Sequence, residues 1–207
     1  MNPESVNVDD IKVCKADSKL WIKYEKKPLR IKTGDIELNE GGILPYINPK
    51  TKKPFKEYPN GKEDFRRYNI NIPVEGELNK IMKSIDSMME GLEGLDDLEF
   101  SKCIREGDPE EKYHTKDKIN VKFRSEFETN KITTVVYKPE KGNPKEVTIN
   151  KFSDVEKLIK LGSVVNLVIV INKIWVSETK YGLNIECEQI YVKPKEVVKE
   201  KIVCAFD

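Results

Sequence analysis

Lysine and aromatic residues alternate in the first clear strand pattern of the chain. Trp21 stands between Lys19 and Lys23, followed by Tyr24. Alternation along a strand puts Lys19, Trp21 and Lys23 on one face. Lysines neutralise phosphates and aromatic rings stack on bases, so this face is typical of a surface that binds a nucleic-acid strand. The alternative is that Trp21 covers a neighbouring strand or a dimer interface.

A second mixture of aromatic and basic residues fills the segment 39–64. Its glycines and prolines exclude regular structure over most of this length. Loops this long are usually functional or disordered, and a lysine-rich loop with interleaved aromatic rings suits a flexible single strand. The alternative is a solvated lysine-rich loop whose aromatic residues are anchored in the core. The candidate binding residues here are Tyr46, Lys52, Lys53, Phe55 and Tyr58.

Further candidates lie on the faces of predicted strands or at the tip of a predicted hairpin. Side chains at alternate positions of a strand share a face, so basic residues two apart can neutralise neighbouring phosphates together. These candidates are Arg30 and Lys32, Lys122 and Arg124, and, at the hairpin tip, Lys180 and Tyr181. With Trp21, Lys23 and the loop residues, they form the predicted nucleic-acid site.

The charge is segregated along the sequence. The formal net charge is only +1, although 35% of the residues are charged. Residues 12–74 carry 15 basic and 8 acidic residues, a net charge of +7, and residues 112–151 carry 10 and 5, a net charge of +5. Residues 75–111 carry 4 basic and 12 acidic residues, a net charge of −8. The commonest explanation of this acidic part is a solvated helix surface, and the alternative is a docking surface for a protein partner.

The predicted fold is organised around a hairpin over residues 163–192. Its first strand is apolar on both faces, which is typical of a central strand. Helical spacing of apolar residues predicts a helix from about residue 75 to Gly91 and a second helical piece at 95–104, and a short helix at 154–160 precedes the hairpin. Strands followed by one short helix and a final long hairpin are the order of an OB-fold, a five-stranded Greek-key barrel.

We therefore expect a mainly β protein, an elaborated OB-fold with extra strands and an acidic helical insertion at about 75–111. One domain is expected over residues 19–193, after a partly mobile segment 1–18 and before a tail at 194–207. The loops that bind oligonucleotides in this fold correspond here to 39–64 and to the tip of the final hairpin.

Cysteine and histidine usage argues against metal or catalytic chemistry. The cysteines at 14, 103, 187 and 204 are far apart, and His114 is the only histidine. Zinc sites and histidine-based catalysis need clusters of such residues, and no phosphate-binding or nucleophile motif is present. We expect no enzyme activity, no cofactor and no metal. No apolar run is long enough for a membrane span, and we expect a reducing, intracellular location without membrane contact.

Three groups of short motifs are familiar as a set. They are Lys27–Thr33 with Gly41-Gly42-Ile43, Arg67–Ile72 before a helix, and Lys173–Val176 with Tyr181-Gly182-Leu183 and Gln189-Ile190. In this order the pattern resembles the single-stranded DNA-binding proteins of large nucleocytoplasmic DNA viruses, of which African swine fever virus has one. It is more distantly similar to the single-stranded DNA-binding protein of T7-type phages. The resemblance spans roughly residues 19–192.

The resemblance implies an OB-fold that coats single-stranded DNA during replication, recombination and repair, without catalysis. It implies the host cytoplasm or a viral replication compartment as the location. Trp175 shares a strand face with Ile169 and Ile171 by simple alternation, so we favour a core position for it. The phage-type proteins have an acidic C-terminal tail that competes for the DNA groove, whereas the tail here has mixed charge.

Two functions are therefore weighed. The first is a non-sequence-specific single-stranded DNA-binding protein, with replication proteins as further partners and a homodimer as an open alternative. The second is a protein–protein interaction or scaffold module that uses the acidic helical segment. The near-zero net charge and the acidic segment favour the second, whereas the interleaved lysine and aromatic residues favour the first.

Overall fold

The molecule is a mainly β protein built on one strongly curled sheet, as the sequence predicts. The computed structural model describes residues 1–16, 19–39, 42–45, 68–111, 114–126, 128–129, 131–140, 143–150 and 152–193. Its early elements are the 3-10 turns η1 (Pro3–Ser5) and η2 (Val8–Asp10) and the strands β1 (Ile11–Ala16), β2 (Lys19–Tyr24), β3 (Lys27–Glu37), β4 (Gly42–Pro45) and β5 (Tyr68–Pro73). The later elements are α1 (Gly76–Met89), β6 (Glu99–Ser101), β7 (Ile104–Arg105), β8 (Lys118–Phe123), β9 (Val135–Glu140), β10 (Asn143–Val147), α2 (Phe152–Leu158), β11 (Val164–Val176) and β12 (Lys180–Val192).

The strand pairing follows the OB-fold path. From β3 the sheet passes to β11, then to β12, β8, β5 and β4. β12 runs parallel to β8, and the other neighbours on this path are antiparallel. Because β4 is the next strand after β3, the path returns to the part of the chain where it began. The sheet thus curls into a half-barrel, and α2 precedes the final β11–β12 hairpin as the fold requires.

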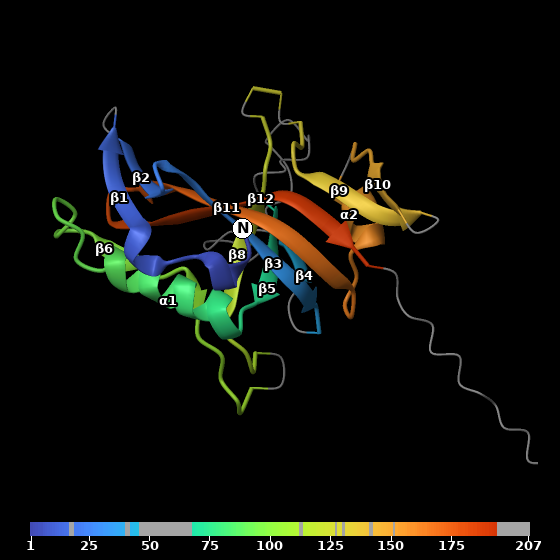
Figure 1. The fold of residues 1–207 in the computed structure, drawn as a ribbon, viewed down its shortest axis with the longest axis horizontal. Coiled ribbons are helices and arrows are strands. Elements are labelled where there is room, and N and C mark those ends of the chain that lie inside the picture. Colours follow the sequence, from blue (N-terminus) through green and yellow to red (C-terminus); the bar gives the residue numbers. More distant parts are fainter. Residues whose placement is uncertain are drawn as a thin grey trace, which may run out of the picture.

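The β11–β12 hairpin is the centre of this arrangement, and it crosses the middle of the molecule in Figure 1. Ile169 and Ile171 of β11 are fully buried, and Ile185 of β12 is 3% exposed. β11 pairs with β3 and β2 on its other edge. Continuous β-branched residues therefore form a strand with neighbours on both sides, as expected for a buried run.

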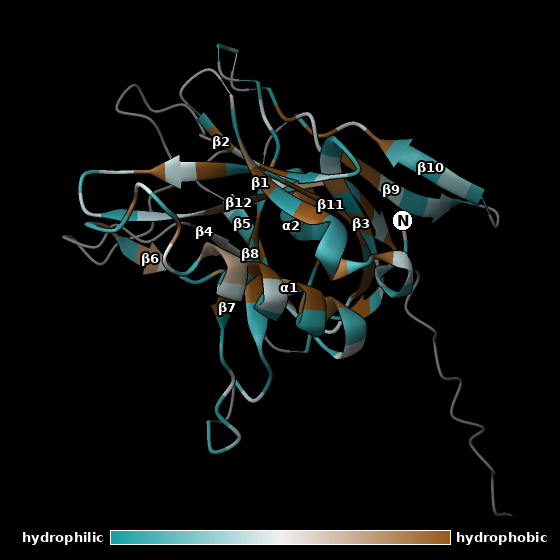
Figure 2. Cartoon of the chain, turned by 60° about the vertical axis from the view of Figure 1, so that its left-hand side comes forward, coloured by the Kyte–Doolittle hydropathy of each residue, from teal (hydrophilic) through white to brown (hydrophobic). Residues whose placement is uncertain are grey.

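Helix α1 covers one open side of the curled sheet together with the N-terminal turns. Its apolar residues recur at helical spacing and are buried; they are Leu78, Ile81, Met82, Ile85 and Met89. Figure 2 shows hydrophobic residues on α1 and along the central strands, where they share one core. The Tyr181 hydroxyl of β12 donates a hydrogen bond to the carbonyl of Met89 (2.7 Å), which ties the end of α1 to the central hairpin.

The insertion 75–111 is helical only in its first part. The helical piece expected at 95–104 is wrong, because β6 forms there and runs parallel to the start of β12. Asp86 of α1 explains the extended backbone that follows. Asp86 is 7% exposed, and its carboxylate accepts hydrogen bonds from the backbone N–H groups of Cys103 and Ile104 at 3.0 and 3.1 Å. A buried carboxylate with these two donors holds the chain in an extended turn rather than a helix.

Two strands differ from the sequence expectation at the edges of the sheet. Residues 11–16, within the segment expected to be partly mobile, form β1, which pairs with β2 along its whole length. In the β9–β10 hairpin, Pro139 and Pro144 face each other as strand partners, although proline usually marks a turn. Pro144 is tolerated because β10 has no further neighbour among the described residues, and Pro139 because β9 pairs with β12 only over residues 135–137, before the proline.

Candidate nucleic-acid interface

The side of the sheet opposite the core is polar and basic, and we call it the outer face. On β2 the buried residues Ile22 and Tyr24 alternate with Trp21 and Lys23, which point to this side. On β3 the buried Leu29 and Ile31 alternate with Arg30 and Lys32. Strand pairing then carries the same face across β11 and β12 to β8.

The two tryptophans of the chain meet on the outer face, with a lysine between them. Trp21 of β2 is the strand partner of Lys173 of β11, whose Nζ lies 5.6 Å from the centre of the Trp21 ring. Trp175 follows two residues later on β11 and is 36% exposed. We call Trp21, Lys173 and Trp175 the aromatic platform. A platform of this kind offers two rings for stacking and one cation for a phosphate.

Trp175 packs its indole ring against a glycine of the neighbouring strand. Its indole lies over Gly182 of β12, at a distance that leaves no room for a Cβ, which would meet Cζ2 of the ring at 2.7 Å. The indole Nε1–H donates to the carbonyl of Leu183 at 3.1 Å. One face of the ring is therefore packed on the backbone, and the hydrogen bond fixes its orientation. The remaining exposed surface is pre-organised for a flat ligand such as a base.

The core position favoured for Trp175 is wrong, and a β-bulge is the reason. Between Ile171 and Lys173 the β11–β12 register shifts by one residue, so Asn172 is extra in β11. Simple alternation from Ile171 would turn Lys173 and Trp175 inward. The extra residue reverses the phase, and Ile174 points inward instead, at 7% exposure.

The basic residues predicted on strands also lie on the outer face. Lys122 of β8 pairs with Glu186 of β12 at the Cα level. The side chain of Lys122 is exposed in part. Desolvation by the surrounding strands lowers the pKa of its ammonium group, and the negative charge of Glu186 partly offsets this shift. Arg30 bonds Glu188 (Nε to Oε2, 2.8 Å), and Arg124 contacts Glu186 at 3.2 Å and Glu188 at 3.7 Å.

The residues at the hairpin tip are placed differently. Lys180 is at the surface, where its Nζ pairs with Glu99 of β6 at 2.8 Å. Tyr181 is only 2% exposed, with its ring 5.2 Å from that of Phe100 and its hydroxyl bonded inside the molecule. A ring without open surface cannot stack on a base. The prediction of Tyr181 as a binding residue is therefore wrong, and Tyr181 is a core residue.

The five candidates of the long segment, Tyr46, Lys52, Lys53, Phe55 and Tyr58, lie outside the described residues.

Two residues of the platform, Lys173 and Trp175, were missed as binding candidates by sequence reasoning. A signal existed in retrospect, because a polar Asn172 interrupts a run of buried β-branched residues, and Gly182 leaves space opposite Trp175. A hollow of about 410 Å³ between β1 and the end of β2 is lined by three lysines, two carboxylates and a thiol, which are Lys12, Lys23, Lys26, Asp10, Glu25 and Cys14.

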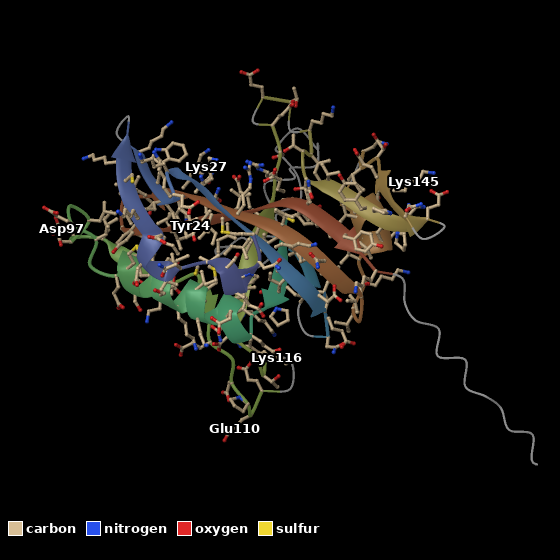
Figure 3. All side chains as sticks on the ribbon, viewed as in Figure 1. Tyr24, Lys27, Asp97, Glu110, Lys116 and Lys145 are labelled. Carbon is tan, nitrogen blue, oxygen red and sulfur yellow. The ribbon has the colours of Figure 1, made fainter. Side chains whose placement is uncertain are left out.

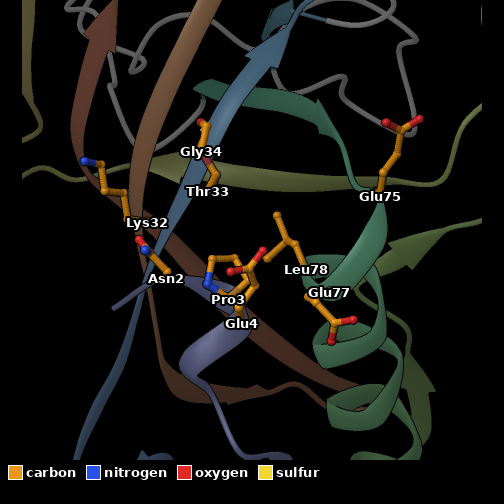
Figure 4. Close-up of a pocket in the computed structure, with 9 residues that line it drawn as sticks. All are labelled: Asn2, Pro3, Glu4, Lys32, Thr33, Gly34, Glu75, Glu77 and Leu78. Atoms are coloured by element: carbon orange, nitrogen blue, oxygen red, sulfur yellow. The ribbon is translucent and has the colours of Figure 1, made fainter.

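Acidic groups gather on the side of α1. Figure 3 shows Asp97 and Glu110 at the far ends of the insertion loops, on the side of α1, whereas Lys27 stands at the opposite side. A hollow of about 350 Å³ between η1, β3 and the start of α1 is lined by Glu4, Glu75 and Glu77 among others. In Figure 4 the ammonium of Lys32 points away from these carboxylates. The side of α1 is therefore less favourable for a polyanion than the outer face.

Metal and thiol chemistry find little support in the described part of the chain. No group of three or more His, Cys, Asp and Glu side chains there could hold a metal ion. Burial raises the pKa of the Cys103 and Cys187 thiols, which keeps them protonated and poorly reactive. Over the same residues, no helix has the length and apolar character needed to cross a membrane.

Comparison with known proteins finds a distant structural likeness. No protein-family model matches the chain, and no curated protein matches it. A solved structure that is similar is that of a "single-stranded DNA-binding protein from bacteriophage Enc34, C-terminal truncation". It shares 14% identity and a TM-score of 0.46, over 92% of this chain and 98% of that chain. At that TM-score the likeness assigns neither fold nor function, and the viral family suggested by the short motifs stays a prediction.

Proposed function

We propose that this chain binds single-stranded DNA without sequence specificity, through the outer face of its sheet. The observation that carries the proposal is the aromatic platform, in which both tryptophans of the chain lie on the basic side of the sheet with Lys173 between them. Two separate aromatic rings suit successive bases of a flexible strand, and every base has a face that can stack on them.

The lysines of the outer face support the proposal because they can bind the phosphates of the strand. Lys23, Lys32 and Lys122 lie on this face, and within the part of the chain that the structure describes no carboxylate forms an ion pair with them. Phosphates bound by such lysines release condensed counterions, so affinity falls steeply with salt. Readout of base edges is not needed for this mode, which makes it independent of sequence.

Duplex DNA fits this surface less well. The aromatic rings can stack only on unpaired bases, because the faces of paired bases are covered by their neighbours in the duplex. We therefore propose a role in coating single strands during replication, recombination and repair, with no catalysis by this chain.

The experiment is an anisotropy titration with a labelled single strand of about thirty nucleotides, a length that spans several OB-fold sites, at low and moderate salt. Unlabelled duplex serves as competitor. We expect salt-sensitive binding that duplex does not displace, and a loss of about 1–3 kcal/mol for each tryptophan replaced by alanine. Lys145→Ala on β10, far from the outer face, is the control and should bind like the parent chain. Absence of binding at low salt would overturn the proposal.

One observation favours the protein–protein alternative for a different surface. Glu90, Glu93, Asp96 and Asp97 are exposed in the insertion, and no basic residue occurs between 90 and 99 to neutralise them. An uncompensated acidic loop suits a basic protein partner better than DNA. Replacing these residues by their amides should abolish such a contact and leave DNA binding unchanged.

A further inference from the structure

The centre of the outer face holds an arginine–glutamate network, which we define as Arg30, Arg124, Glu186 and Glu188. Glu188 accepts from Arg30 at 2.8 Å and lies 3.7 Å from an η nitrogen of Arg124, and Glu186 lies 3.2 Å from Nε of Arg124. Both glutamates are on β12. This strand lies between β11 and β8, and β11 in turn pairs with β3. Carboxylates at this position are unexpected on a surface proposed to bind phosphates, because they repel them.

A second β-bulge aims these carboxylates outward. The β11–β12 register shifts between Val168 and Ile169, so Glu188 is the extra residue of β12 between Cys187 and Gln189. Cys187 and Ile190 are fully buried on the core side. Glu188 and Gln189 consequently both reach the outer face, where regular alternation would allow only one of them. Bulges that re-aim a side chain are common next to functional sites.

Fold stability alone is a weak reason for the network. The side chains are 53% exposed for Arg30, 30% for Arg124, 27% for Glu188 and 22% for Glu186. Ion pairs with this much solvent contact contribute little to folding, because solvent screens them and two long side chains lose freedom. β12, which carries both glutamates, lies between β11 of the aromatic platform and β8 of Lys122, so a DNA strand that contacts both crosses β12 next to the network.

Carboxylate and phosphate compete for the same feature of arginine. The guanidinium group offers parallel N–H donors that fit either anion in a two-pronged arrangement. In the DNA-free protein Arg30 and Arg124 are held by carboxylates, so they are already extended over the sheet. A phosphate that binds one of them displaces a carboxylate rather than only a counterion, and leaves that carboxylate beside the polyanion.

We propose that Glu186 and Glu188 are resident competitors for phosphate, which position the two arginines and limit the affinity for single strands. This inference rests on the proposed function and deepens it. The glutamates keep binding reversible, so that a coated strand can be handed to other proteins. Removing the charge of Glu188 leaves Arg30 without its carboxylate partner, and removing the charge of Glu186 leaves Arg124 with only the 3.7 Å contact to Glu188, so each change makes an arginine more available to phosphate. Affinity then rises, and so does its salt dependence, because one more phosphate is neutralised with release of its counterion.

The test compares Glu188→Gln and Glu186→Gln with the parent chain by anisotropy titration across a range of salt concentrations. Each variant should bind about 2- to 5-fold more tightly at moderate salt, the effect of about one exposed charge pair. The slope of log K against log salt should steepen by about 0.7 for each added phosphate contact on a single strand. Glu188→Asp, which keeps the charge, should retain the parent slope.

Glu140→Gln is the matched control for net charge. Glu140 pairs with Lys145 at 2.6 Å on the β9–β10 hairpin, so its change adds the same charge at a remote place. Its affinity and slope should stay at the parent values. Unchanged or weaker binding by both outer-face variants, in a chain that itself binds, would overturn this inference and leave the proposed function standing. Binding gained only in the variants would support both, and absence of binding in parent and variants would overturn both.

Discussion

Replacing Gly182 by alanine tests the geometry of the aromatic platform without touching either tryptophan. The new Cβ would lie 2.7 Å from Cζ2 and 2.9 Å from Cε2 of Trp175, and 3.0 Å from the carbonyl oxygen of Ser101. Ordinary contact begins at 3.4 Å, so the ring must move away by about 0.7 Å. The same shift stretches the 3.1 Å bond from Nε1 to Leu183 beyond hydrogen-bond range.

The free-energy change on folding should be small, because two effects oppose each other. Loss of the indole hydrogen bond costs about 0.5–1.5 kcal/mol, and the reduced freedom of the unfolded chain returns about 0.4–1 kcal/mol. We expect a change in the free energy of unfolding of at most about 1 kcal/mol, or about 2–4 °C in Tm for a chain of this size. The local effect on Trp175 should be large by comparison.

Intrinsic fluorescence in a Trp21→Phe background isolates Trp175, because the chain has no other tryptophan. Gly182→Ala should shift its emission to longer wavelength and increase quenching by acrylamide. Binding of single-stranded DNA should weaken by about 5-fold, which corresponds to part of one stacking contribution. In a Trp175→Ala background, the same glycine change should lose its effect on binding. Unaltered emission and quenching in the Gly182→Ala chain would refute the packing of the indole on this glycine.

Three further predictions concern the insertion and the core. Asp86→Asn should lower the free energy of unfolding by about 2–4 kcal/mol in denaturant titrations. The carboxylate accepts two backbone N–H groups, whereas the amide side chain has only one oxygen and turns its own N–H₂ group towards the other N–H. An unchanged denaturation midpoint would contradict this. Lys83 above all holds the pKa of Asp117 at about 2, below the unfolded value of about 4. The stability from this carboxylate is therefore complete above pH about 4 and lost as pH falls towards about 2, by about 1–2 kcal/mol, and Asp117→Asn should remove that part of the pH dependence in thermal melts. Tyr181→Phe should cost about 1 kcal/mol, through the lost bond to Met89, yet bind DNA like the parent chain; weakened DNA binding would return Tyr181 to the site.

Most of the fold follows from local patterns that survive in the structure. The β-branched run before Trp175, the short helix before it and the helical spacing from Leu78 to Met89 all predict the observed elements. What failed depended on single residues whose effect is tertiary. Asp86 binds the backbone N–H groups of Cys103 and Ile104, which holds that part of the insertion extended rather than helical.

Strand alternation in the sequence predicted the outer-face positions of the basic residues, but not those of Lys173 and Trp175 on the aromatic platform. Alternation places Trp21, Arg30 and Lys32 correctly on the outer face because no bulge interrupts their strands before those positions. The bulge at Asn172 shifts the phase of β11, so Trp175 points outward against expectation, and the bulge at Glu188 shifts the phase of β12. The prediction for Tyr181 failed because its hydroxyl bonds to Met89 at the end of α1. This contact joins residues far apart in the sequence, and a position near a hairpin tip gives no sign of it.

Tryptophan emission during titration with unlabelled single-stranded DNA tests the central proposal most directly. Both tryptophans of the chain lie on the aromatic platform, so the signal reports on this surface alone. We expect emission to fall to a plateau as bases stack on the rings, with high salt reversing the change. DNA binding by anisotropy without any change in tryptophan emission would contradict the account, because the strand would then occupy another surface.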